Sequence, residues 1–501
     1  MDPAFLSLPL REAADAALQA ARDAGASHAD LRVERLRGQD LSLRDGRVES
    51  LSDDVTVGLA VRVVHDGTWG FASGHDVTPD EAARLAREAV ALAKVARPLN
   101  SQPIELAEEP VYVGTWVSAY DVDPFAVPTS EKVALFEAWS RELLASDQVD
   151  HVDVSLQQAM EGKFYADSSG TMTTQQRVRM QPQITGTRVD PGGGFETMRT
   201  IAPPVGRGWE YLTDGRYDWR EELANMPERL VEKAKASSVE PGRYDLVIDP
   251  SNLWLTIHES IGHATELDRA LGYEAAYAGT SFATLDQLGT LKYGTELMHV
   301  TGDRHTPHGL STVGWDDEGV AAQEWDIIRG GTLVGYQLDR RMALQNATSL
   351  GISGRSNGCA FADGPHRVPV QRMPNVSLQP AAGGPSTDEL IAGVERGIYI
   401  VGDKSWSIDM QRYNFQFTGQ RFYEIKAGRL VGQLRDVAYQ ATTTEFWGSM
   451  EAIGGPQTYV LGGAFNCGKA QPSQTAAVSH GCPAALFRGV NILNTVREAG
   501  A

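Results

Sequence analysis

Alternating apolar and polar positions predict that the chain begins with a helix followed by antiparallel strands. Residues 9–22 repeat apolar positions at helical spacing, and Gly25 is expected to end that helix. A period of two then takes over, which is typical of strands with one buried face. The strands are expected at 30–36, 40–44 and 55–64, with a turn at 45–46 between the second and the third.

A second helix is predicted at 78–96 from its start signals. Thr78 can cap the helix and Pro79 suits its first position. Glu81 can reach back to complete a capping box. This helix, the strands and the first helix form one α+β unit over residues 1–96.

The remaining pattern predicts an α+β fold in three parts. Residues 97–128 are rich in proline and lack periodicity, which favours a linker. Helices at 130–145 and 219–236 flank short strands, so 129–239 is expected to be a middle α+β domain. From 240 to 501 strands and turns dominate. We therefore expect two small α+β amino-terminal parts followed by a large, mostly antiparallel β-rich carboxy-terminal domain that carries one motif helix.

Composition narrows the classes of function. The 501 residues carry a formal net charge of -20, and such an acidic chain is repelled by nucleic acid. The three cysteines, Cys359, Cys467 and Cys482, are too few and too scattered for a disulfide framework. Neither a signal peptide nor an apolar run of about 18 residues is recognisable. These features predict a cytoplasmic address and no membrane partner.

The candidate chemistry lies on a helix expected to begin at Asp249, as its cap, and to end at Gly272. His258, Glu259 and His263 fall in its middle. Zinc-binding histidines on a regular helix prefer a spacing of four, which points both rings to one face. A spacing of five leaves them roughly 140° apart. A shared metal ion therefore predicts a bulged or broken helix around Gly262.

Two histidines leave a catalytic zinc ion one protein ligand short of its usual three. Cys467, in a glycine-rich stretch of the same domain, is the better candidate for the third ligand, and Glu266 is its rival. Glu259 is the candidate general base, because a carboxylate beside a zinc-bound water can accept its proton. The alternative interpretation of the motif is a helix with one buried and one surface histidine.

Each of the other candidate sites also has a purely structural interpretation. His305 and His308 share a loop and could bind a metal, although loop histidines are usually solvated. The acidic tripeptide 316–318 could bind a cation, but a solvated turn is the more common outcome. His480 near Cys482 could form a thiol-imidazole pair, but a core cysteine beside a loop histidine is the more common outcome.

Several segments together resemble the TldD/PmbA family of metallopeptidases, and its metal-bearing TldD branch in particular. The likeness runs from about residue 27 to 494. The matching segments are HESIGHATE at 258–266, DDEG at 316–319, GGTLVG at 330–335, LDR at 338–340, GR at 354–355, RMPN at 372–375, GIY at 397–399 and CGK at 467–469.

The resemblance implies a cytoplasmic zinc peptidase that acts on unfolded or flexible peptides and in some cases trims leader segments. It implies zinc ligands at His258, His263 and Cys467, with Glu259 in catalysis. It also implies a dimer, commonly a heterodimer with a paralogous subunit that lacks the metal motif. Two hypotheses from other classes remain: a non-catalytic binding or regulatory subunit, and a cysteine peptidase that uses Cys467 or Cys482.

Overall fold

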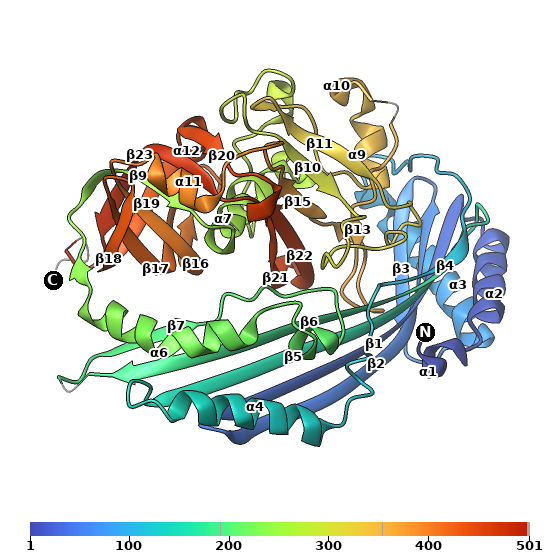
Figure 1. Cartoon of the computed structure of the whole chain (residues 1–501). Coiled ribbons are helices and arrows are strands. Elements are labelled where there is room, and N and C mark those ends of the chain that lie inside the picture. Colours follow the sequence, from blue (N-terminus) through green and yellow to red (C-terminus); the bar gives the residue numbers. More distant parts are fainter. Residues whose placement is uncertain (191, 353, 498–501) are drawn as a thin grey trace.

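One seven-stranded sheet joins the two amino-terminal α+β parts. The computed structural model describes residues 1–190, 192–352 and 354–497, and Figure 1 shows this sheet as one layer beneath the β-rich carboxy-terminal part. The strand order is β3-β2-β1-β5-β6-β4, with β7 paired to β6. The strands are β1 (His28–Arg44), β2 (Arg47–His65), β3 (Thr68–Gly74), β4 (Val113–Val117), β5 (His151–Asp167), β6 (Met172–Val189) and β7 (Phe195–Arg199).

The pairing of β1 with β5 connects the two predicted parts, because these strands run antiparallel over most of their length. All neighbours in the sheet are antiparallel except β4 and β6. Strand β4 lies within 97–128, so this segment is more than the predicted linker: it supplies a strand to the sheet. The two strands expected at 30–36 and 40–44 are one continuous strand, β1, because the residues between them stay paired with β2 on one side and β5 on the other.

Helices pack on this sheet as two separate groups. Helices α2 (Leu10–Asp23) and α3 (Pro79–Ala96) contact each other and form one core with β1, β2 and β3. Helices α4 (Thr129–Leu144) and α6 (Trp219–Lys235) form another core with β5 and β6. The even-numbered residues of β6, such as Ile184, face this second core. The odd-numbered residues therefore face the carboxy-terminal part. Two single-turn helices, α1 (Pro3–Leu6) and α5 (Glu210–Thr213), and a 3-10 turn (Arg97–Leu99) complete the amino-terminal elements.

One of the two hydrogen bonds predicted for the capping box at the start of α3 is confirmed. Thr78 accepts a hydrogen bond from the Glu81 backbone at 3.2 Å, as expected. The reciprocal half of the capping box was wrong, because the Glu81 carboxylate pairs with Arg84 one turn later. Helix α2 ends near Gly25, which adopts a left-handed φ of 91°, as the sequence predicted.

The carboxy-terminal part is β-rich and mostly antiparallel, which confirms the expected fold class. An eight-stranded sheet has the order β16-β9-β23-β19-β17-β18-β8, with β20 paired to β23, and a four-stranded sheet has the order β12-β11-β10-β15. Two pairs of strands, β13 with β14 and β21 with β22, lie outside them. The bounds are β8 (Ser237–Ser238), β9 (Gly242–Ile248), β10 (Val300–Asp303), β11 (Glu324–Arg329), β12 (Thr332–Leu333), β13 (Ala360–Phe361), β14 (Val370–Gln371), β15 (Asn375–Leu378), β16 (Arg396–Ile408), β17 (Asn414–Lys426), β18 (Arg429–Arg435), β19 (Val437–Thr442), β20 (Met450–Ile453), β21 (Val460–Lys469), β22 (Gln474–Cys482) and β23 (Ala485–Asn494).

Short helices occupy the connections of this part, apart from the motif segment described below. The helix at Thr387–Ala392 begins with the capping box predicted between Ser386 and Glu389, and both of its hydrogen bonds are present. The others are α9 (Arg340–Gln345), α10 (Ala347–Leu350), α12 (Thr443–Gly448) and two 3-10 turns (Leu285–Gln287 and Pro456–Thr458); the capped helix is α11. Over the described ranges, no helix has both the length and the apolar character needed to cross a membrane.

Buried ion pairs join the amino-terminal sheet to the carboxy-terminal part. Lys163 on β5 donates to Asp317 at 2.7 Å and to the Ala362 carbonyl at 2.9 Å. Its ammonium also lies 3.4 Å from Glu161 and 3.7 Å from Glu34. All four charged side chains are almost fully buried. Because buried charges are costly unless paired, these contacts fix how the two parts meet.

The acidic tripeptide 316–318 supplies the carboxy-terminal half of this junction. Glu318 accepts from Arg62 on β2 at 2.8 Å and from the Arg340 backbone at 2.9 Å. Asp316 turns inward and accepts from the backbone of Glu318, Val320 and Ala360. The expected solvated turn was wrong, because all three carboxylates are buried at the junction. Their hydrogen-bond partners are protein groups, which explains them without a cation.

Replacement of Lys163 tests this junction. Lys163→Met leaves Asp317, Glu161 and Glu34 without their shared cation, so the free energy of unfolding should fall by about 3–5 kcal/mol. Urea unfolding followed by fluorescence measures the change. Arg44→Met on β1 removes an exposed pair with Asp153 and should have little effect. Equal stability of the two variants would contradict a structural role for the junction.

Candidate metal centre

The motif segment contains the helix irregularity that the histidine spacing predicted. Asp249 caps α7 (Pro250–Ile257), with Pro250 in the first turn. A π-helical turn at His258–Gly262 follows, and the His263 N–H donates to the His258 carbonyl across five residues. A 3-10 turn (His263–Thr265) and α8 (Leu267–Ala270) complete the segment. The prediction of a bulged helix is therefore confirmed, and Gly272 lies at its end with a φ of 88°.

The π turn brings the two imidazoles together, with ring centroids 4.7 Å apart. Gly262 contributes differently from what the sequence suggested, since its φ of -52° is ordinary for a helix. A side chain there would meet the sulfur of Met373, because an added Cβ would lie only 2.5 Å from it. The glycine therefore makes room for Met373 rather than allowing a distorted backbone.

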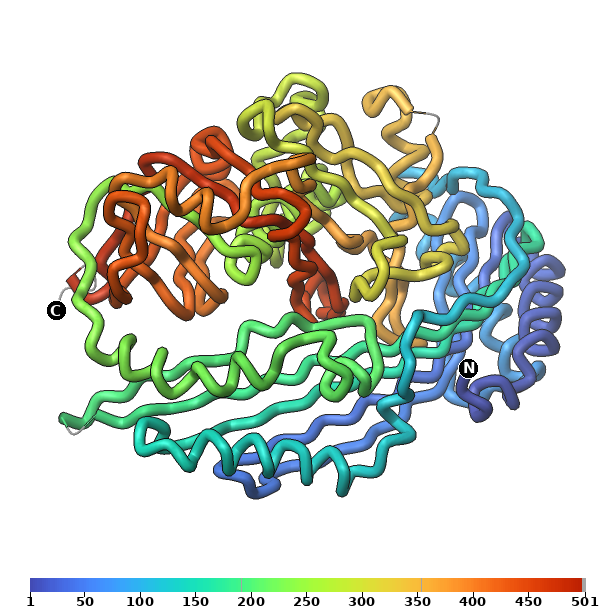
Figure 2. The backbone as a smooth tube through the Cα atoms, in the orientation of Figure 1, coloured from blue at the N-terminus to red at the C-terminus, as the bar shows by residue number. Residues whose placement is uncertain are grey.

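Cys467 lies beside the two histidines in space, although it is 204 residues from His263 in the sequence. One nitrogen or sulfur atom from each of His258, His263 and Cys467 lies within 4.8 Å of the other two. The Cys467 sulfur lies 3.5 Å from His263 Nε2. Each of the three residues is 5% exposed. Figure 2 shows the β21–β22 hairpin, in dark red, reaching from the carboxy-terminal part towards the amino-terminal sheet.

A second histidine fixes the orientation of the His258 ring. His480 Nδ1 lies 2.9 Å from the Val376 carbonyl, which can only accept, so His480 must donate from Nδ1. Its Nε2 is then an acceptor, 2.7 Å from His258 Nδ1. His258 therefore carries its proton on Nδ1 and keeps a lone pair on Nε2, the form that binds metal.

Glu266 does the same for His263. Its carboxylate lies 3.0 Å from His263 Nδ1, which leaves Nε2 facing Cys467. Lys469 and Arg269 also pair with this carboxylate, at 3.2 and 3.4 Å. Glu266 was the rival candidate for the third ligand. Its contacts instead place it behind His263, where carboxylates commonly orient a metal-binding imidazole.

The electrostatics favour neutral imidazoles beside a thiolate. Burial lowers the pKa of His258 to about 4, although the nearby Glu259 charge opposes this. Burial likewise lowers the pKa of His263. Burial alone would raise the pKa of the Cys467 thiol, but the Arg372 guanidinium and His263 outweigh it, so that this pKa is lowered. All three shifts are in the direction that metal binding requires, towards neutral imidazoles and a thiolate.

Glu259 forms a partly buried ion pair that the sequence did not predict. Arg412 Nη1 donates to Glu259 Oε2 at 2.6 Å. Arg412 lies in the turn between β16 and β17 and has a left-handed φ of 64°. Its carbonyl accepts from the Thr443 hydroxyl at 2.8 Å, which anchors the turn. The Arg412 Nε is buried and has no hydrogen-bond partner among the described residues.

The remaining candidates do not pair with one another as the sequence suggested. His305 is exposed, and His308 is 3.2 Å from the Gly206 carbonyl. His480 and Cys482 do not form the suggested pair: His480 contacts His258, while the Cys482 sulfur lies 3.7 Å from the Pro250 carbonyl. Burial raises the pKa of Cys482 well above its ordinary value, which keeps it an unreactive thiol.

Comparison with known proteins identifies related sequences over most of the chain. Family models described as PmbA/TldA metallopeptidase C-terminal domain and PmbA/TldA metallopeptidase domain 1 match residues 241–494 and 29–93. A metalloprotease of Methanothermobacter thermautotrophicus is 27% identical, over 93% of this chain and 96% of that protein. A protein named zinc metalloprotease TldD homolog, from Saccharolobus solfataricus, is 23% identical over 93% and 96%.

A solved structure shares the fold. TldE from Thermococcus kodakarensis superposes with a TM-score of 0.71, over 96% of this chain and 99% of that one. The sequence identity is 15%. The arrangement of a long amino-terminal sheet beneath a β-rich carboxy-terminal part is therefore shared at low identity.

The environment of His258 can be tested without metal. In chelator-treated protein its imidazole should titrate with a pKa of about 4, because burial disfavours the charged ring. A lowered pKa means that the unfolded chain binds this proton first, so stability should fall as the pH decreases from 6.5 towards 4. NMR titration of histidine ring signals measures the pKa, and His258→Gln identifies the signal. A midpoint at 6.5 would contradict the buried site.

Proposed function

The chain belongs to the PmbA/TldA metallopeptidase family, and on this premise we propose that it is a zinc-dependent peptidase that cleaves unfolded or flexible peptides. Metallopeptidase activity at this general level follows from the family and from the relatives named metalloproteases. Zinc, the residues that bind it and the class of substrate are parts of the proposal. The observation that carries it is the meeting of His258, His263 and Cys467 at one buried point.

This set of donors fits zinc. Two imidazole nitrogens and one thiolate are ligands that zinc prefers, and catalytic zinc sites use three protein ligands with a fourth position left for water. His480 and Glu266 hold the two rings with their Nε2 atoms free, so the donors are oriented before a metal binds. The lowered pKa of Cys467 favours the thiolate form.

Glu259 is the proposed general base, next to His258 in the π turn. Zinc bound at this centre would lower the pKa of its water to about 7. Glu259 would accept the proton of that water and later deliver it to the leaving amine. Arg412 holds one carboxylate oxygen of Glu259 at 2.6 Å, which restricts the carboxylate to one orientation. We assign Arg412 as a positioning residue for the base.

Burial of the centre favours flexible substrates. Since each proposed ligand is 5% exposed, a folded protein surface could not reach the metal, whereas an extended segment could enter. Trimming of leader or precursor segments belongs to the same class of reaction. We further propose that the enzyme is cytoplasmic and works as a dimer. In one form of this dimer, the second subunit is a paralogue that lacks the metal motif. The fold shared with TldE supports such a pairing.

Two alternatives remain open to experiment. A binding or regulatory subunit would not need Glu259, both histidines and Cys467 in one place. A cysteine peptidase is favoured by one contact, since the Cys467 sulfur lies 3.5 Å from His263 Nε2. A metal chelator would inactivate the proposed enzyme and would spare a cysteine peptidase.

Substitution at the centre should separate metal binding from catalysis. Glu259→Gln should keep stoichiometric zinc but lose at least about 100-fold in kcat, the usual effect of removing a general base. Cys467→Ser should lose most of its zinc, because a thiolate ligand is replaced by a poor one. Metal analysis and cleavage of an unstructured peptide measure both. A metal-free wild type, or a fully active Glu259→Gln variant, would overturn the proposal.

Arg412 gives a second test. Arg412→Ala should retain zinc and KM but lower kcat by about 100-fold, because a misplaced base is a poor one. Arg412→Lys keeps the positive charge and should recover part of the loss. Gln411→Ala changes an exposed neighbour in the same turn and should behave like the wild type. Parallel losses in zinc content would instead indicate a structural role for Arg412.

A further inference from the structure

A cavity of about 260 Å³ adjoins the candidate metal centre and has no role in the function proposed so far. One of its walls is α7, through Ser251, Trp254 and Leu255. These residues precede His258 by seven, four and three positions, so all of them lie on the helix face that bears His258. The cavity is therefore the next space along the same face of the helix.

Strand β21 also connects the cavity to the candidate metal centre. Residues 462–466 line the cavity, and Cys467 follows directly. Trp254 belongs to both sites: its ring stacks on His480 with centroids 6.3 Å apart and lies 6.2 Å from the His258 ring. A group bound in the cavity would thus lie beside the metal centre.

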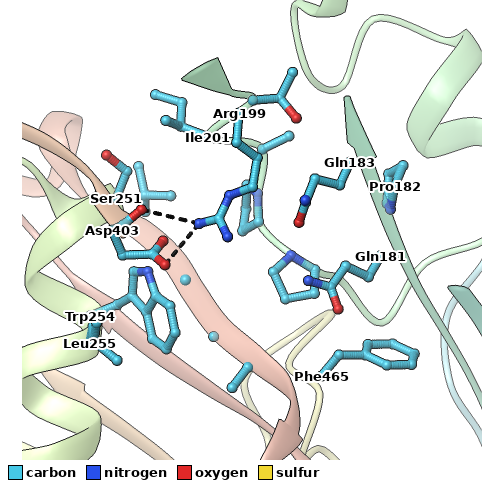
Figure 3. Close-up of a pocket in the computed structure, with 18 of the residues that line it drawn as sticks. Gln181, Pro182, Gln183, Arg199, Ile201, Ser251, Trp254, Leu255, Asp403 and Phe465 are labelled. Carbon is cyan, nitrogen blue, oxygen red and sulfur yellow. Dashed lines mark hydrogen bonds and ion pairs between the residues drawn. The ribbon is translucent and has the colours of Figure 1, made fainter. Parts of the chain in front are cut away.

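The opposite wall comes from the amino-terminal sheet. Gln181 and Gln183 are odd-numbered residues of β6 and face away from the core formed with α4 and α6. Figure 3 shows both side chains pointing across the cavity towards Trp254, with Arg199 reaching over from β7. The cavity is formed only when the two layers of the molecule come together.

The lining suits an aromatic side chain. Three aromatic rings and two proline rings contribute flat apolar surfaces, and the glutamine amides offer polar edges that can contact a ring or its hydroxyl. The rings belong to Trp254, Trp406, Phe465, Pro203 and Pro204.

One pair of opposite charges in the cavity is already neutralised. Arg199 donates to the Asp403 carboxylate at 2.8 Å, so neither group is left for a ligand charge. Lys404 also lines the cavity but is exposed. A charged substrate side chain would lose hydration without gaining a buried partner.

The size of the cavity further limits the kind of group that can bind there. Sites for drug-sized ligands usually occupy about 300–1,000 Å³, so 260 Å³ suits one large side chain rather than a separate cofactor. We infer that this cavity is a substrate subsite that receives an aromatic side chain of a residue flanking the scissile bond. The inference rests on the proposed peptidase function and adds a side-chain preference to it.

The test compares peptides that differ at one position. Unstructured peptides carry Phe, Ala or Glu at each position flanking the cleaved bond, and kcat/KM is measured with the zinc-loaded enzyme. Phe should be preferred to Ala by about tenfold or more at one of these positions, as expected when a pocket discriminates by size. Equal rates for Phe and Ala, or a preference for Glu, would overturn the inference.

Filling the cavity provides the matched comparison. Gln183→Trp places a large ring in the cavity from the β6 wall and should remove the preference for Phe. Thr187→Trp introduces the same ring on the same face of β6 outside the cavity and should keep the preference. A preference that survives in Gln183→Trp would place the aromatic subsite elsewhere.

Binding separates this inference from the proposed function. In the Glu259→Gln background, the Phe peptide should bind about tenfold more tightly than the Ala peptide, and Gln183→Trp should abolish the difference. Fluorescence anisotropy of labelled peptides measures both. If no peptide is cleaved but this difference appears, the catalytic proposal fails and the subsite remains. Equal binding of the two peptides overturns the subsite.

Discussion

The candidate centre depends on one backbone hydrogen bond, from the His263 N–H to the His258 carbonyl. In a regular helix the same two imidazoles would point to different faces. The wider π turn aligns them, with ring centroids 4.7 Å apart. Every other feature of the centre follows from that alignment, because His480, Glu266 and Cys467 each approach a ring whose position the turn has set.

The sequence was most informative where local geometry decides the structure. The extra residue between His258 and His263 predicted the π turn, and Asp249, Thr78 and Ser386 marked real helix starts. These signals act over three to five residues, so they can be interpreted without knowledge of the fold. The α+β class followed in the same way from the change between helical and strand periodicity.

The sequence was least informative where distant segments meet. Arg412 lies 153 residues beyond Glu259, and nothing in its local pattern indicated an ion pair. His480 attracted attention because of Cys482, yet its partner is His258, 222 residues away. The acidic tripeptide 316–318 suggested a solvated turn, because partners such as Lys163 are supplied by another layer of the molecule. Such contacts depend on the tertiary arrangement, which local periodicity does not encode.

The β21–β22 hairpin has a consequence for the timing of activity during synthesis. It supplies Cys467 from one strand and, from the other, the His480 side chain that orients His258. Cys467 follows His263 by 204 residues, and His480 follows His258 by 222. On the proposed ligand set, a growing chain cannot complete its centre until both residues have been synthesised. A peptidase built in this way has no activity while its own segments are still unfolded. Unfolded segments, in this chain and in neighbouring nascent chains, are the ones most vulnerable to cleavage.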